Sequence, residues 1–87
     1  MSAAHIEPRC VWPLAAELGE GPVWLAPEQA LYFVDIKGQR IHRLKSGSNT
    51  ADHTMTWQLS EPVGFVQPLL DGAFVAGLKS GLHRFEP

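Results

Sequence analysis

A stretch from the first half of the chain returns near its end. Residues 36–44 read Ile-Lys-Gly-Gln-Arg-Ile-His-Arg-Leu, and residues 78–85 repeat this order one residue shorter, as Leu-Lys-Ser-Gly-Leu-His-Arg-Phe. The offset from His42 to His83 is 41 residues, within the roughly 40 to 50 residues of one four-stranded propeller blade. The repeat therefore predicts copies of one small unit that stack and cover each other's apolar faces.

Short strands joined by turns are expected throughout, because the 87 residues include eight glycines and seven prolines. The near-continuous apolar run at residues 30–36 predicts an interior strand that is covered on both faces. Alternation at residues 54–59 predicts a strand with one solvated face, at the outer edge of its sheet. Further strands are expected at residues 10–14, 22–25, 40–45, 63–69, 73–77 and 82–85, with a loop at 46–49.

These elements predict an all-β chain with about one and a half blades of four-stranded antiparallel sheet. We expect an N-terminal strand region at residues 1–18, a first blade at 19–62 and the start of a second blade at 63–87. Such a piece exposes two broad apolar faces, so the remainder of a propeller or further copies of the chain should cover them. An independent small β-barrel is a third alternative, and it predicts a stable monomer.

Several classes of protein are disfavoured by composition. The net charge of −2, without any run of Lys or Arg, gives no electrostatic reason to expect nucleic acid or an acidic membrane as partner. The single cysteine, Cys10, excludes an internal disulfide and is expected to be a small buried hydrophobe. Residues 1–7 lack the features of a secretion signal, and no apolar stretch is long enough to cross a bilayer. The cytoplasm is the expected compartment.

One carboxylate stands in an unusual position. Glu20 lies between Gly19 and Gly21, immediately before an expected strand, and the glycines allow the backbone a positive φ on either side. Read without other information, Glu20 is a surface carboxylate in a glycine-rich turn. It is nevertheless the residue of this chain that we expect to carry chemistry.

Three motifs carry a resemblance to a known family. They are Leu-Gly-Glu-Gly-Pro-Val-Trp at residues 18–24, Leu-Tyr-Phe-Val-Asp-Ile at 31–36 and Ala-Gly-Leu-Lys-Ser-Gly-Leu at 76–82. With them the chain, from about residue 10 to 85, resembles the senescence marker protein-30, gluconolactonase and luciferin-regenerating enzyme family. Within that family it is most similar to the bacterial aldonolactonases.

The resemblance implies a six-bladed β-propeller with one divalent cation, Ca²⁺, Zn²⁺, Mg²⁺ or Mn²⁺, in its central channel. Glu20 matches the family's glutamate ligand, whereas the asparagine and aspartate ligands and the substrate contacts lie beyond residue 87. No catalytic residue is therefore expected within this chain, and its substrate-binding residues are unknown. The implied function is the N-terminal part of a metal-dependent sugar lactonase that hydrolyses an aldonolactone; the alternative is a non-catalytic propeller fragment that self-associates as a scaffold or binding module.

Other polar and aromatic residues are interpreted as structural. Asp35 is expected to accept backbone hydrogen bonds in a turn, and Asp71, beside Gly72, to serve as a turn residue. The histidines, at positions 5, 42, 53 and 83, are scattered and are not expected to share a metal. The tryptophans, at positions 12, 24 and 57, are expected to pack between blades, with a sugar platform as an alternative at position 24 alone.

Overall fold

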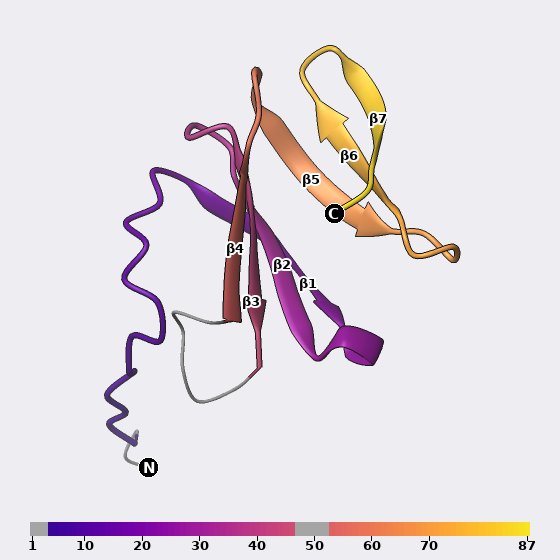
Figure 1. Cartoon of the computed structure of the whole chain (residues 1–87). Coiled ribbons are helices and arrows are strands. Elements are labelled where there is room, and N and C mark those ends of the chain that lie inside the picture. Colours follow the sequence, from indigo (N-terminus) through magenta and orange to yellow (C-terminus); the bar gives the residue numbers. More distant parts are fainter. Residues whose placement is uncertain (1–3, 47–52) are drawn as a thin grey trace.

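The computed structural model describes residues 4–46 and 53–87, and these residues form two antiparallel β-sheets (Figure 1). The first sheet has four strands in sequence order: β1 (Gly19–Leu25), β2 (Ala30–Asp35), β3 (Arg40–Lys45) and β4 (Thr54–Gln58). The second has three: β5 (Val63–Pro68), β6 (Phe74–Leu78) and β7 (Gly81–Phe85). The predicted all-β class is confirmed.

Within each sheet, every strand pairs with the next strand along the chain. β2 lies between β1 and β3, as its apolar sequence predicted, and β4 forms the outer edge of the first sheet. Residues 47–49, most of the loop expected at 46–49, lie outside the described residues.

Local backbone chemistry explains the tight connections between strands. A single 3-10 turn, Ala26–Glu28, joins β1 to β2 and ends at Gln29, whose backbone is left-handed with φ 54°. Between β5 and β6, Gly72 has a φ of 91°, a region that glycine enters freely. The Asp71 carboxylate accepts the Ala73 N–H at 3.1 Å, so its predicted role as a turn residue is confirmed.

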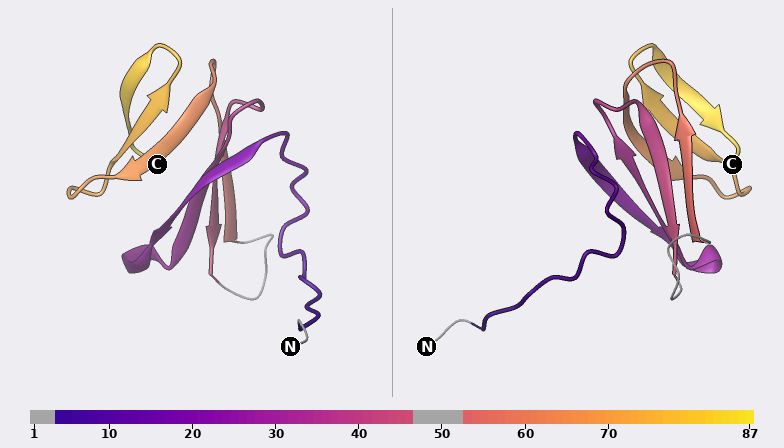
Figure 2. Two further views of the ribbon diagram at one scale, coloured as in Figure 1. Left: turned by 180° about the vertical axis from the view of Figure 1, so that it is seen from behind. Right: turned by 60° about the vertical axis from the view of Figure 1, so that its left-hand side comes forward.

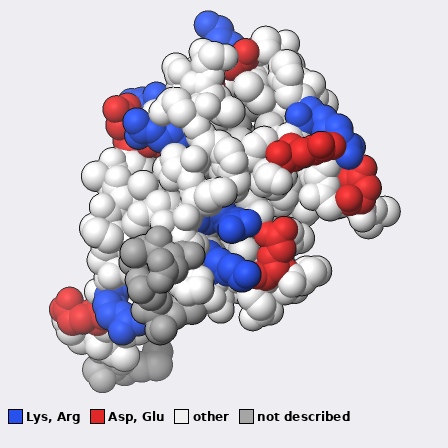
Figure 3. Space-filling view, in the orientation of Figure 1, with Lys and Arg blue, Asp and Glu red and all other residues white. Residues whose placement is uncertain are grey.

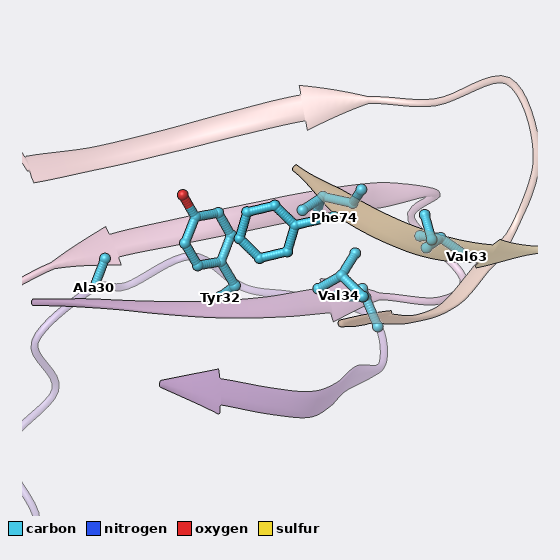
Figure 4. Packing of buried hydrophobic residues seen from close by; sticks show 8 residues of the cluster. Ala30, Tyr32, Val34, Val63 and Phe74 are labelled. Carbon is cyan, nitrogen blue, oxygen red and sulfur yellow. The ribbon is translucent and has the colours of Figure 1, made fainter. Parts of the chain in front are cut away.

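The two sheets pack face to face, with β5 lying across β1 and β2 (Figures 1 and 2). The interface is filled by fully or almost fully buried side chains, several of which are shown in Figure 4: Ala30, Tyr32, Val34, Ile41, Val63, Val66, Phe74 and Ala76. Trp57, on β4, stacks over Tyr32 and meets Phe85 of the second sheet edge-on, with ring centroids 5.2 Å apart. The prediction that Trp57 packs between neighbouring sheets is confirmed.

The segment before β1 differs from its prediction. Residues 4–18 contain no strand, so the strand expected at residues 10–14 is wrong. The Leu14 N–H instead bonds the carbonyl of Trp12 at 2.8 Å, and Ala15 has a φ of 55°, so the chain turns where a strand would continue. Pro13, which has no N–H to donate, interrupts the ladder that a strand would need.

The later part of this segment lies against the outer face of the first sheet, and the earlier part extends away from it (Figure 2). Trp12 packs edge-on against Phe33 and His42, with ring centroids 6.0 and 5.3 Å away, rather than between the two sheets. Cys10 is exposed, so the expectation that it is buried is wrong. The segment that carries Cys10 pairs with no strand of the described structure, so the side chain is not placed in the core.

Charges are mixed on the face shown in Figure 3, where acidic and basic side chains lie close together in small groups separated by uncharged surface. Within residues 4–46 and 53–87, no helix combines the length and the apolar character needed to cross a bilayer.

Candidate functional site

A bulge in β1 presents Glu20. Glu20 pairs with Val34 of β2, and the next pair along the strand joins Val23 to Tyr32, so two residues of β1 face one of β2. Gly21 sits in this bulge with a φ of 59°, a conformation that a residue with a Cβ rarely adopts. The Glu20 side chain is exposed at the beginning of the strand.

Asp35, at the end of β2, holds the segment that leads into β1. Its carboxylate accepts the backbone N–H groups of Glu17 and Leu18, each at 2.9 Å, and that of Gly38 at 3.0 Å. The side chain is fully buried. The prediction that Asp35 is a structural acceptor of backbone hydrogen bonds is confirmed.

The hydrogen bonds also decide the charge state of Asp35. Burial alone would raise the pKa of this carboxyl group, but the N–H donors of Gly38, Glu17 and Leu18 outweigh burial, and the pKa lies below its ordinary value. Asp35 is therefore an ionised buried acceptor with three backbone partners, and its oxygens are occupied by the fold.

An open pocket of about 320 Å³ lies beside Glu20, lined by Gly19, Glu20, Pro22, Leu31 and Phe33. Leu31 and Phe33 also line an apolar groove of about 350 Å³ beneath the N-terminal segment, together with Val11, Trp12, Leu14, Ala15, Ala16 and Leu44. Glu20 is the charged residue of the pocket. Its carboxylate oxygens suit a hard divalent cation, which takes oxygen ligands.

A divalent cation takes several ligands, so one carboxylate does not complete a metal site. Among the described residues, 4–46 and 53–87, no three His, Cys, Asp or Glu side chains are grouped so that they can hold a metal ion. Asp35 lies near Glu20 in register, opposite Gly19, but its carboxylate is committed to backbone donors, and Asp71 pairs with Arg84 at 2.7 Å.

The two repeated histidines occupy different surroundings. His42 is fully buried, its Nδ1 lies 2.8 Å from the Thr56 hydroxyl, and its Nε2 has no hydrogen-bond partner within the described residues. His83 is exposed and lies 3.0 Å from the Ser80 hydroxyl. Burial lowers the pKa of His42. The sequence did not indicate that His42 is buried while His83 is exposed, because the repeat places both residues on equivalent strands.

Of the remaining tryptophans, Trp24 is 52% exposed on β1. That exposure is too great for a residue packed between the two sheets, so the expected packing role is not seen within the described structure. The sugar-platform alternative for Trp24 stays a prediction.

Residues 18–87 match the family model described as the SMP-30/Gluconolactonase/LRE-like region. This chain belongs to that family. The match confirms the resemblance expected from the motifs, and it includes Glu20, its bulge and Asp35. In this SMP-30/gluconolactonase/LRE-like chain, the residues before position 18, Trp12 among them, lie outside the matched region.

Two of the curated relatives that the chain matches are named as lactonases. The SMP-30/gluconolactonase/LRE-like chain is 37% identical over 78 residues to 6-deoxy-6-sulfogluconolactonase of Pseudomonas putida, a match covering 90% of the chain and 26% of the relative. It is 36% identical over 75 residues to regucalcin of Danio rerio, covering 86% and 24%. Pentonolactonase XacC of Haloferax volcanii is 55% identical over 29 residues, covering 33% and 10%. The chain spans about a quarter of the length of the first two relatives.

Proposed function

We propose that this chain is the N-terminal part of a divalent-metal-dependent sugar lactonase that hydrolyses an aldonolactone to the aldonic acid. The observation that supports the proposal most directly is the exposed Glu20 carboxylate, presented on a glycine bulge inside the segment that matches the family. Relatives named sulfogluconolactonase and pentonolactonase support a sugar lactone as substrate.

In this proposal Glu20 binds one cation, Ca²⁺, Zn²⁺, Mg²⁺ or Mn²⁺, and residues outside the described structure complete its ligand set. A cation held there would supply Lewis-acid chemistry, polarising a lactone carbonyl and acidifying a water molecule. Glu20 contributes a carboxylate oxygen at the start of β1, and the apolar side chains of Leu31 and Phe33 line the same pocket.

The wider architecture is part of the same proposal. We place the chain in a six-bladed propeller, with residues 19–62 as the first blade, 63–87 as the start of the second and 1–18 before them. The two packed antiparallel sheets support this arrangement, because adjacent blades pack face to face. A cytoplasmic location belongs to the proposal too, as does the absence of a nucleic-acid or membrane partner.

The decisive experiment compares Glu20→Gln with Glu17→Gln in the full-length protein. Glu17 lies three residues earlier and is also exposed, so the second variant is a matched control for the loss of one negative charge. We expect Glu20→Gln to lose bound metal, measured by elemental analysis, and lactone opening, measured by acid release. Glu17→Gln should retain both. Metal content and activity equal to the parent in Glu20→Gln would remove Glu20 from the site.

A second candidate function, self-association as a scaffold or binding module, is favoured by exposed apolar residues. On the outer face of the second sheet, Phe65 and Leu82 flank Gly77 and are 42% and 72% exposed. Light scattering of the 87-residue chain would test this candidate. Particles of several 9.6 kDa chains that dissociate in Leu82→Lys would support it, and a stable monomer would argue against it.

A further inference from the structure

We propose that Asp35 is a positioning residue for Glu20, and that its carboxylate sets the affinity of the site for a divalent cation. The inference rests on the proposed function, because it takes Glu20 as a metal ligand. It goes further in assigning a role in that site to a buried residue that never touches the cation.

Asp35 fixes the chain immediately before Glu20. Its two carboxylate oxygens bind the N–H groups of Glu17 and Leu18, the third and second residues before Glu20. The carbonyl of Leu18 accepts the Ile36 N–H at 3.0 Å. The backbone entering β1 is thus held to the end of β2 through both donors and an acceptor.

The carboxylate is in turn held by the turn that follows β2. Gly38 donates its N–H to Asp35 at 3.0 Å, and a Cβ added to Gly38 would lie 2.8 Å from the Asp35 Cγ. Carbon atoms do not approach so closely without displacement, so the turn has room for the carboxylate only while residue 38 is glycine. Because Asp35 is also fully buried, its position is tightly defined.

The second sheet allows a comparison with these contacts between the end of β2 and the segment before β1. There the Lys79 N–H bonds the carbonyl of Pro62 at 3.0 Å, repeating the bond between Ile36 and Leu18. The nearby carboxylate is Glu61, which is not fully buried and accepts a single backbone N–H, from Ser80. A buried carboxylate with three backbone donors therefore occurs in the sheet that carries Glu20.

The register shows which residue replaces Glu20 in the second sheet. His42 pairs with Phe33 and His83 pairs with Ala76, so Val34 of β2 corresponds to Gly77 of β6. Glu20 is the partner of Val34, whereas Phe65 is the partner of Gly77. The three backbone N–H bonds to a buried carboxylate thus occur beside the strand that carries Glu20. Within the described residues, they do not occur beside the strand that carries Phe65 at the corresponding position.

A metal ligand between two glycines needs such support. Gly19 and Gly21 leave the backbone around Glu20 with more conformational freedom than other residues would. A binding constellation must be held to within about 0.5 Å of its productive geometry, and ordering a mobile ligand lowers the affinity. Asp35 removes much of that freedom before the cation binds.

The test uses three variants of the full-length protein: Asp35→Asn, Gly38→Ala and, as a control, Asp71→Asn. In Asp35→Asn, the side-chain NH₂ group would face backbone N–H groups, so that a donor meets donors. In Gly38→Ala, the added Cβ would displace the Asp35 carboxylate without removing its charge. Asp71 is likewise an acceptor of a backbone N–H in a turn, but it belongs to the second sheet. Calorimetric titration of the metal-free protein with Ca²⁺ and with Zn²⁺ measures affinity, and thermal melting measures stability.

We expect Asp35→Asn and Gly38→Ala to raise the metal dissociation constant about 10-fold or more, the effect typical of residues that support a metal ligand. Lactone opening should recover toward the parent kcat as metal is added to saturation. Asp71→Asn should lower the melting temperature without changing the dissociation constant. A purely structural role for Asp35 would instead lower the melting temperature and leave metal affinity unchanged.

The outcomes separate this inference from the proposed function. If Glu20→Gln binds metal like the parent, the proposed function fails. If Glu20→Gln loses metal while Asp35→Asn and Gly38→Ala bind it like the parent, the role of Asp35 fails alone. If Asp35→Asn does not fold, the same titration of Gly38→Ala decides. If neither variant folds, the role of Asp35 is in folding, and the inference is overturned.

Discussion

The rings of Tyr32 and Phe74 lie 4.4 Å apart, centroid to centroid, and join the first sheet to the second (Figure 4). Both side chains are fully buried. Tyr32 also donates its hydroxyl proton to Glu28 at 2.7 Å, so its ring is fixed at one end by a hydrogen bond and on its face by Phe74. The pair stands at the centre of the contact between the sheets.

Phe74→Ala should lower the free energy of unfolding by about 3–5 kcal/mol, because it removes a buried ring and leaves a cavity against Tyr32. Urea denaturation measures the change. Leu70→Ala is the control, since Leu70 is fully exposed, and it should change the free energy by no more than about 0.5 kcal/mol. Equal effects of the two substitutions would show that the sheets do not depend on this contact.

Asp35 should make stability depend on pH in acid. Its pKa in the folded protein is lowered from the ordinary 3.8, so the unfolded chain binds the proton more readily. The stabilisation is therefore complete above that ordinary value and is lost as pH falls through the folded pKa. Unfolding free energies of the parent and Asp35→Asn should differ most near neutral pH and converge in strong acid. A difference that stays constant with pH would contradict this.

His42 should cause a separate loss of stability at mildly acidic pH. Burial lowers its pKa from 6.5, Arg40 acts in the same direction and Asp35 opposes them, while Trp12, Phe33 and Thr56 are its uncharged neighbours. The unfolded chain takes up a proton first, so stability is highest above 6.5 and declines as pH falls toward the folded pKa.

Replacement by phenylalanine isolates this effect. His42→Phe should remove the loss of unfolding free energy between about pH 7.5 and about pH 5.5, as measured by urea denaturation at both values. His83→Phe changes an exposed residue and should leave the parent's pH dependence in place. The same decline in parent and His42→Phe would assign the effect to another group.

Gly77 and Phe65 should show energetic coupling. A Cβ on Gly77 would lie 2.6 Å from the Phe65 Cδ1, so Gly77→Ala forces the ring off the strand. In the parent the substitution should destabilise the protein, and in a Phe65→Ala background the penalty should shrink. A double-mutant cycle measured by urea denaturation should give a coupling of about 0.5–3 kcal/mol, the range for residues in contact. Additive effects would show that the ring moves away at no cost.

The strands could be predicted because their signals are local. The apolar run at residues 30–36 and the alternation at 54–59 depend on neighbours in the sequence, and the observed β2 and β4 follow them. The strand expected at residues 10–14 failed because hydrophobic content alone does not supply a pairing partner. The expected burial of Cys10 failed as well, because the segment that carries it forms no strand and leaves its side chain exposed.

The candidate site could be predicted only in part. Glu20 stands out in sequence by its flanking glycines, and the bond from Gly38 to Asp35 spans three residues, so a turn predicts it. The bonds from Glu17 and Leu18 to Asp35 span 18 and 17 residues and arise once β1 and β2 have paired. Metal binding by Glu20 stays a prediction, because a single carboxylate does not by itself make a metal site.

The serial pairing of the strands has a consequence for biogenesis. Every hydrogen-bonded neighbour within the two sheets is also the next strand along the chain, so each hairpin closes over a short loop and with little loss of entropy. Gln58, at the end of the first sheet, leaves the ribosome before Phe74 does. Assembly can follow the order of translation, and the meeting of the two aromatic rings is a late event.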